Sequence, residues 1–179
     1  MGSEAVAGIG IVRKIDQLAF AVNQGITQGM LPLVAYCYSR NLFERMKKII
    51  AFSAASTFIF SILCMTVSLI FAPQLTAIFI RDSATIQYGS AFLRIICLAI
   101  PVYSITFTII AVFQAIGHGA EPFILTLLRK GSLDIILMFI IRKNLGVSLI
   151  TMASPITEAI ALFIGIIMLY HFLQQLKKA

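Results

Sequence analysis

Charged side chains are scarce in this chain of 179 residues, where they make up 12% of the sequence against 60% for hydrophobic residues. No Lys, Arg, Asp or Glu occurs from Ile49 to Ile80 or from Ile95 to Ala120. A soluble domain of this length could not bury so much apolar surface, so that class is excluded. Because a helix needs about 20 apolar residues to cross the hydrocarbon of a bilayer, the sequence predicts a multi-pass membrane protein.

The sequence also lacks the residue patterns that catalysis, metal binding and nucleic-acid binding need. Cys37, Cys64 and Cys97 lie in apolar segments without the spacing of a metal site. No Ser-His-Asp set, phosphate-binding loop or pair of carboxylates is recognisable, so we predict no enzyme, no metal and no organic cofactor. The net charge of +7 is not arranged with stacking aromatics, which argues against a nucleic-acid partner.

Five apolar segments are long enough to span a bilayer, at about residues 15–38, 49–70, 95–116, 122–141 and 145–173. A backbone in contact with lipid must form its own hydrogen bonds, and these segments are too long and too uniformly apolar for barrel strands. The predicted fold is therefore an all-α integral membrane protein with about five transmembrane helices.

Basic residues set the expected orientation in the cell membrane, because Lys and Arg concentrate on the cytoplasmic side. The densest cluster lies between the first two segments and consists of Arg40, Arg45, Lys47 and Lys48. An odd number of spans places the amino terminus outside and the carboxy terminus, with Lys177 and Lys178, in the cytoplasm. Five basic residues on the opposite side reduce this bias, namely Arg13, Lys14, Arg81, Arg142 and Lys143.

Local signals indicate where helices begin and end. Asn41 and Glu44 have the spacing of a capping box, which predicts a helix start near Leu42. Glycines at 117 and 119 indicate a tight turn, and Pro122 is suited to the first turn of the following helix.

The first span carries an unusual number of polar side chains, each of which costs free energy in hydrocarbon. At helical spacing they form two adjoining faces, one with Asp16, Asn23 and Thr27 and one with Gln17, Gln24 and Gln28. One interpretation is that this stripe lines a water-filled cavity, with Asp16 as a proton or cation site. The other is that Arg13 pairs locally with Asp16 while the amides join neighbouring helices.

Other residues of the spans suggest helix packing or a substrate pathway. Gly25 and Gly29 have the spacing that allows another helix to approach closely, and Pro32 predicts a kink. Asp134 is spaced to pair with Lys130, or else belongs to a substrate pathway. Glu158 has no basic residue within one turn, so it faces either a cavity or the outer interface.

Several stretches together resemble the multidrug and toxic compound extrusion (MATE) transporters. They are Ala5–Asp16, Gln24–Val34, the stretch Phe113–Pro122 with its continuation to Gly131, and Pro155–Glu158. The stretch that ends in Pro32-Leu33-Val34 resembles the segment that closes the second helix of each half in that family.

The resemblance implies a transporter of twelve helices in two lobes, with residues 1–179 forming an incomplete second lobe that matches the eighth to twelfth helices. Such a protein exchanges small lipophilic or cationic drugs for protons or sodium by alternating access. Its partners are the lipid bilayer and the missing amino-terminal lobe, and we expect this part to be inactive alone. Asp16 is then the best candidate to face the shared cavity.

Two other functions stay open. One is a flippase for lipid-linked oligosaccharides from the same superfamily, with a cationic cavity built from Arg13, Lys14, Arg129 and Lys130. The other is a non-transporting membrane assembly partner or a gene remnant.

Overall fold

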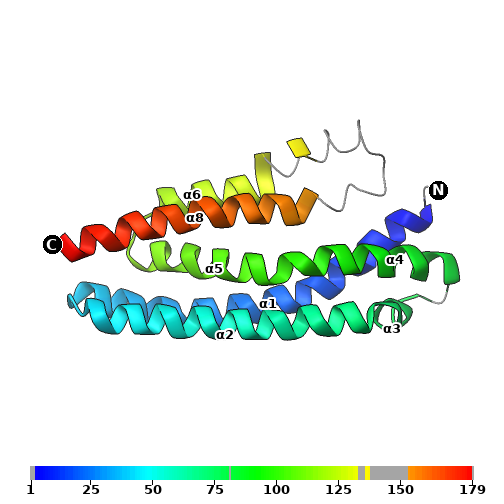
Figure 1. Ribbon diagram of the computed structural model, residues 1–179, viewed down its shortest axis with the longest axis horizontal. Helices are drawn as coiled ribbons and strands as arrows, with labels where there is room; N and C mark the ends of the chain where they lie inside the picture. Colours follow the sequence, from blue (N-terminus) through cyan, green and yellow to red (C-terminus); the bar gives the residue numbers. More distant parts are fainter. Residues whose placement is uncertain (1–2, 81, 133–135, 138–152, 179) are drawn as a thin grey trace.

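The computed structural model describes residues 3–80, 82–132, 136–137 and 153–178, and every regular element in that part of the chain is helical (Figure 1). The elements are α1 (Ser3–Ser39), α2 (Phe43–Ile70), α3 (Ala72–Ala77), α4 (Ser83–Ile96), the 3₁₀ helix η1 (Cys97–Ala99), α5 (Ile100–Ala115), α6 (Ala120–Leu127), the π-helical turn η2 (Leu128–Ser132) and α8 (Ala153–Lys178). The predicted all-α fold is confirmed for the described residues.

The long helices lie side by side along one axis, and the two termini are at opposite ends of the bundle (Figure 1). The turn from α1 to α2, the turn from α5 to α6 and the carboxy terminus share one end. The amino terminus and the connection from α3 to α4 share the other. Among the described residues, three helical stretches are long and apolar enough to cross a membrane, namely Phe43–Ile70, Thr85–Ala115 and Ser154–Gln175.

The helices extend beyond the apolar segments from which they were predicted. α1 begins at Ser3 rather than near Ile15, whereas α2 begins at Phe43, before the apolar segment 49–70 and beside the predicted helix start near Leu42. Neither extension contains a proline, so nothing in the sequence interrupts the helix there. α4, η1 and α5 together enclose the third segment, 95–116. Of the fourth segment, 122–141, the described part is mainly α6 and η2, while Asp134 lies outside the described residues.

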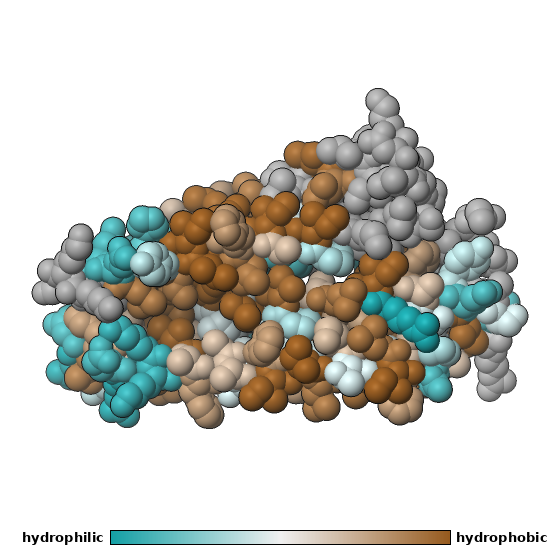
Figure 2. Space-filling model, in the orientation of Figure 1, coloured by the Kyte–Doolittle hydropathy of each residue, from teal (hydrophilic) through white to brown (hydrophobic). Residues whose placement is uncertain are grey.

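The surface has the polarity that a bilayer requires. Figure 2 shows apolar side chains over most of the middle of the bundle and hydrophilic side chains gathered at its two ends, most densely at the end with the α1–α2 turn. Large apolar side chains such as Phe52 and Phe163 are exposed over 77% and 68% of their surface. In water this arrangement would be unfavourable, so the bundle is suited to span a membrane.

The main apolar core lies where α1, α2, α5, α6 and α8 meet. Its buried side chains include Val34, Met46, Val112, Phe113 and Leu125. A second cluster joins α1 to α3 and α4, and a third joins α1 to η1 and α5. α1 therefore contributes to all three clusters and is the central packing element of the described bundle.

Close approaches between helices occur at glycines other than those predicted. A side-chain carbon placed on Gly8 of α1 would lie 3.2 Å from the backbone nitrogen of Gly89 in α4. One placed on Gly89 would lie 2.7 Å from Cγ2 of Thr76 in α3. At Gly25 and Gly29 no atom of the described residues would lie within 4 Å, so the predicted close approach is not found there.

Helix α1 is continuous through Pro32, which lies on its exposed side. Pro32 has no N–H to donate to the helix. The kink predicted at this residue stays a prediction.

The turn from α1 to α2 differs from its prediction. Asn41 adopts a left-handed backbone conformation with φ of 57°, which asparagine tolerates better than most residues. The capping position is Leu42, and no side chain caps the helix there. Glu44 instead contacts Lys47, with 2.6 Å between Oε1 and Nζ. The capping box was wrong, although α2 does begin beside Leu42 at Phe43.

The turn from α5 to α6 is tight, as predicted. Gly117 has φ of +80°, which is accessible to glycine without strain, and the N–H of His118 donates to the carbonyl of Phe113 at 3.0 Å. Pro122 lies buried in the first turn of α6.

This turn predicts a pH dependence of stability. His118 Nδ1 lies 2.9 Å from Glu121 Oε1, outside the membrane-spanning stretches, and this hydrogen bond holds the pKa of Glu121 below its ordinary value. A lowered pKa means that the ionised carboxylate stabilises the fold above pH 4.5, and that this contribution is lost as the pH falls through the lowered value. We expect wild type to melt above Glu121→Gln at neutral pH in detergent, and the difference to vanish as the pH falls below the lowered pKa of Glu121. An undiminished difference in acid would contradict the assignment.

Candidate functional site

An ion pair lies buried between the helices on the α6–α8 side of the bundle. Nε of Arg129, in η2, lies 3.1 Å and 2.9 Å from the two carboxylate oxygens of Glu158, in α8. Both side chains are 3% exposed. Burying either charge alone would cost free energy, and the opposite charge of the partner offsets this cost.

Arg129 has a second partner and an unusual backbone. Its Cζ atom lies 4.3 Å from the centre of the Phe107 ring, which is a cation–π contact. The residue belongs to the π-helical turn Leu128–Ser132, and such turns occur frequently at functional sites. The guanidinium is thus held between a carboxylate and an aromatic face.

Three aromatic rings connect this ion pair to the carboxylate of α1. Phe20 and Phe107 are 4.8 Å apart in an edge-to-face arrangement, and Tyr103 lies 6.2 Å and 6.0 Å from them. The Tyr103 hydroxyl donates to Oδ1 of Asp16 at 3.3 Å. A continuous set of contacts therefore runs from Glu158 through Arg129 and the rings to Asp16.

A cavity of about 210 Å³ opens beside these rings on the α1–α5–α6 side. We call it the arginine cavity; it is lined by Phe20, Gln24, Thr27, Gln28, Phe107, Ile110, Ala111, Gln114, Thr126 and Arg129. Its amides can donate and accept hydrogen bonds, and its rings offer flat apolar faces. Such a lining suits an aromatic ligand that carries polar groups.

The polar stripe of α1 is divided between packing and this cavity. Asn23 is fully buried, where its amide donates to Ser61 Oγ of α2 at 3.0 Å and the Ser61 hydroxyl donates back at 3.2 Å. Gln24 and Gln28 instead line the arginine cavity. Asn23 thus joins two helices, whereas the role of the stripe as the wall of a water-filled pathway stays a prediction.

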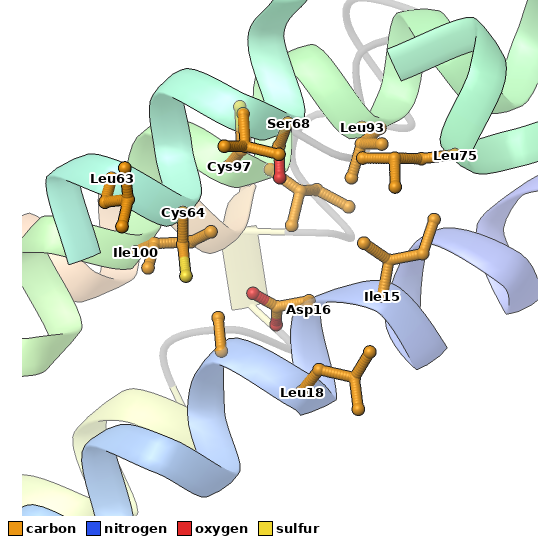
Figure 3. A pocket seen from close by; sticks show the side chains of 13 residues that line it. Ile15, Asp16, Leu18, Leu63, Cys64, Ser68, Leu75, Leu93, Cys97 and Ile100 are labelled. Carbon is orange, nitrogen blue, oxygen red and sulfur yellow. The ribbon is translucent and has the colours of Figure 1, made fainter. Parts of the chain in front are cut away.

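The remaining candidates lie elsewhere. Asp16 is half-buried and lines a different pocket, between α1 and the helices α2 to α4 (Figure 3). Arg13 is exposed on α1, and Asp134 lies outside the described residues. In the part of the chain that the structure describes, no group of three His, Cys, Asp or Glu is placed to hold a metal.

Sequence reasoning treated Arg129 and Glu158 separately and missed their pairing. They are 29 residues apart, so no local spacing relates them. The available signal was that two opposite charges occur within neighbouring apolar segments, where each needs a partner.

Comparisons with known proteins place the chain among membrane transporters. The MatE family model matches residues 1–140. The multidrug export protein MepA of Staphylococcus haemolyticus is 24% identical over 175 residues, which cover 98% of this chain and 38% of MepA. The chain therefore spans less than two fifths of the length of this relative.

Solved structures show the same fold at low sequence identity. A crystal structure of MATE in complex with MaL6 superposes with a TM-score of 0.93 at 18% identity, covering 99% of this chain and 41% of that one. The lipid II flippase MurJ, in an inward closed conformation, gives a TM-score of 0.74 at 17% identity, covering 91% of this chain and 36% of MurJ.

Proposed function

Because this chain belongs to the multidrug and toxic compound extrusion (MatE) family, we propose that it forms most of one lobe of a secondary active drug exporter. The whole transporter exchanges lipophilic or cationic compounds for protons or sodium by alternating access between two lobes. The part of MepA that this chain does not match corresponds to the rest of the transporter, including the other lobe.

The observation that carries this proposal is the arginine cavity in an otherwise apolar bundle. Gln24, Gln28 and Gln114 line it and are exposed at the surface of this chain. Amides at membrane depth are favourable where they face water or other protein rather than lipid. The cavity therefore fits one wall of an aqueous pathway whose opposite wall belongs to the rest of the transporter.

We propose that the coupling ion binds at one of two carboxylates near the arginine cavity. Asp16 and Glu158 lie at the two ends of the set of contacts that runs through the aromatic rings. A proton or sodium ion that binds either carboxylate would change a contact of Tyr103 or of Arg129, and with it the shape of the cavity wall. In the proposed orientation the amino terminus is outside and the carboxy terminus is cytoplasmic.

One prediction concerns transport by this chain alone. Cells that produce only residues 1–179 should not export ethidium above the level of an empty vector, because one wall of the pathway is missing. Fluorescence efflux measurements with MepA as the positive control test this. Export above the vector level would refute the inactivity of the isolated part.

A chimera tests the transporter function itself. Residues 1–179 replace the matching 38% of MepA, and insertion into the membrane is checked before efflux is measured. We expect ethidium export from the chimera and its loss in the same chimera carrying Glu158→Gln. A chimera that inserts stably but exports nothing would count against the function.

The second candidate is a lipid-linked sugar flippase, favoured by the likeness to MurJ. An anionic headgroup needs a net positive cavity, but Arg129 is neutralised by Glu158 and Arg13 is exposed on α1 away from the lining. Drug export is therefore the better supported of the two. Competition between a lipophilic cation and an anionic lipid for binding to the chimera distinguishes drug export from lipid flipping.

A further inference from the structure

Positive charge is concentrated at the turn from α1 to α2. From Gln17 to Ile80 the chain carries one acidic residue, Glu44, and four basic residues, which are Arg40, Arg45, Lys47 and Lys48. Glu44 contacts Lys47 at 2.6 Å and can offset one positive charge, so the turn keeps a net positive charge. Figure 2 shows hydrophilic side chains gathered at this end of the bundle beside an apolar surface.

Two of these cations share an exposed face of α2 with large apolar side chains. Arg45 and Lys48 are exposed and lie about one turn apart, and Phe52 follows about one turn later. Ile59 and Leu63 continue this face along the helix, and 68% and 60% of their surfaces are exposed. We call these five residues the α2 outer face. It changes from cationic to apolar in the direction in which a bilayer changes from headgroups to hydrocarbon.

The length of this face matches one leaflet of a bilayer. At 1.5 Å per residue, α2 advances about 16 Å from Lys48 to Ile59, and half of the hydrocarbon thickness is roughly 15 Å. With Phe52 and Ile59 among the acyl chains, Arg45 and Lys48 therefore lie at the level of the headgroup phosphates.

Tyr36, near the end of α1, supports this depth. Its side chain is exposed over 55% of its surface, and Cζ of Arg40 lies 5.9 Å from the centre of its ring. Tyrosine rings concentrate at the interface between water and hydrocarbon, and an arginine over such a ring lies next to the phosphates. The α1–α2 turn thus has both cations and an aromatic anchor at headgroup level.

We propose that the α2 outer face binds an anionic phospholipid. Its phosphate lies against Arg45 and Lys48, since a guanidinium can hold two phosphate oxygens and an ammonium adds a compact charge. One acyl chain lies along Phe52, Ile59 and Leu63. A zwitterionic lipid is disfavoured because its own headgroup cation opposes the basic pair. The site shares no residue with the arginine cavity, and it does not depend on drug export.

A single tryptophan provides the readout, because the chain contains none. Phe52→Trp places this fluorophore in the proposed site, at a largely exposed position where no packing is lost. The purified variant is reconstituted into vesicles of phosphatidylcholine with phosphatidylglycerol, in which one lipid or the other carries brominated acyl chains. Quenching at equal mole fraction gives the relative affinity of the two lipids. Both leaflets have the same composition, so the orientation of the chain does not enter.

We expect the introduced tryptophan to report a preference for phosphatidylglycerol of about fivefold or more, since each basic residue near an anionic surface contributes about fivefold. Adding Arg45→Gln and Lys48→Gln should lower the preference to about onefold. Arg13→Gln with Lys14→Gln is the matched control, because it removes the same two residue types, both exposed, from the part of α1 nearer the opposite end of the bundle (Figure 1). It should leave the preference unchanged.

Phe163→Trp is the control for the position of the fluorophore. Phe163 is also largely exposed, and it lies more than three turns from the nearest basic residue of α8, Lys177. We expect no preference there.

Three results would overturn the proposal. Equal quenching by the two lipids at position 52 would mean ordinary lipid contact, and quenching by neither would mean that protein, such as a second copy of the chain, covers the face. A preference of the same size at position 163 would assign it to the charge of the whole protein rather than to Arg45 and Lys48.

Discussion

Replacing Glu158 with glutamine lowers the free energy of unfolding by about 3–5 kcal/mol, the usual result of removing one partner from a buried ion pair. Arg129 is 3% exposed, so its charge would stay in an apolar environment beside the Phe107 ring without the countercharge of Glu158. The measurement is unfolding of the purified chain in mixed micelles, followed by circular dichroism as denaturing detergent is added.

Two further variants separate charge burial from a general effect of losing a carboxylate. Glu44→Gln removes an ion pair whose glutamate is 83% exposed, and should cost no more than about 1 kcal/mol. Arg129→Met combined with Glu158→Leu removes both charges, and should recover most of the stability. A double variant as unstable as Glu158→Gln would show that the pair contributes through shape rather than through charge.

Replacing Gly89 with leucine should destabilise the bundle by about 1–3 kcal/mol or more, as overpacking does in tight cores. The first added carbon alone would lie 2.7 Å from Thr76 Cγ2, so Thr76 of α3 would have to shift, and at 3.7 Å from Gly8 Cα it leaves little room toward α1 for the rest of the leucine side chain. Thermal unfolding in detergent measures the loss.

Gly25→Leu is the matched control for this second prediction. It makes the same substitution in a helix where no described atom would lie within 4 Å, and leucine is the better helix former by up to about 1 kcal/mol. We expect it to be neutral or stabilising in this chain. Similar losses at positions 25 and 89 would mean that leucine itself, and not the contact with Thr76, causes the effect.

The fold was predictable because a long apolar segment in hydrocarbon must satisfy its own backbone hydrogen bonds, which a helix does. Hydropathy located the helices, but it could not place their ends. The capping box at Asn41 and Glu44 failed because the capping position of α2 is Leu42, one residue after Asn41, whose backbone is left-handed. Ends depend on one or two backbone angles, which hydropathy does not register.

The site was predictable only in part, because spacing along one helix shows which residues share a face and not what lies opposite. Glu158 and Arg129 come from different spans, and the pairing required the fold. The glycine spacing at Gly25 and Gly29 was real, yet the close approach occurs where Gly8 and Gly89 meet from separate helices. The coupling role of Asp16 and the pathway roles of the other polar residues stay predictions.

A substitution at Gly25 or Gly29 of α1 would have different effects in this chain alone and in the whole transporter. Gly25 and Gly29 are exposed, and no described atom would lie within 4 Å of a side-chain carbon placed on either. If a helix of the proposed other lobe packs there, it would contact main chain rather than side chain. An added methyl group would then be silent in the isolated polypeptide and would clash in the assembled transporter, so tolerance measured on this part alone would not transfer to the whole.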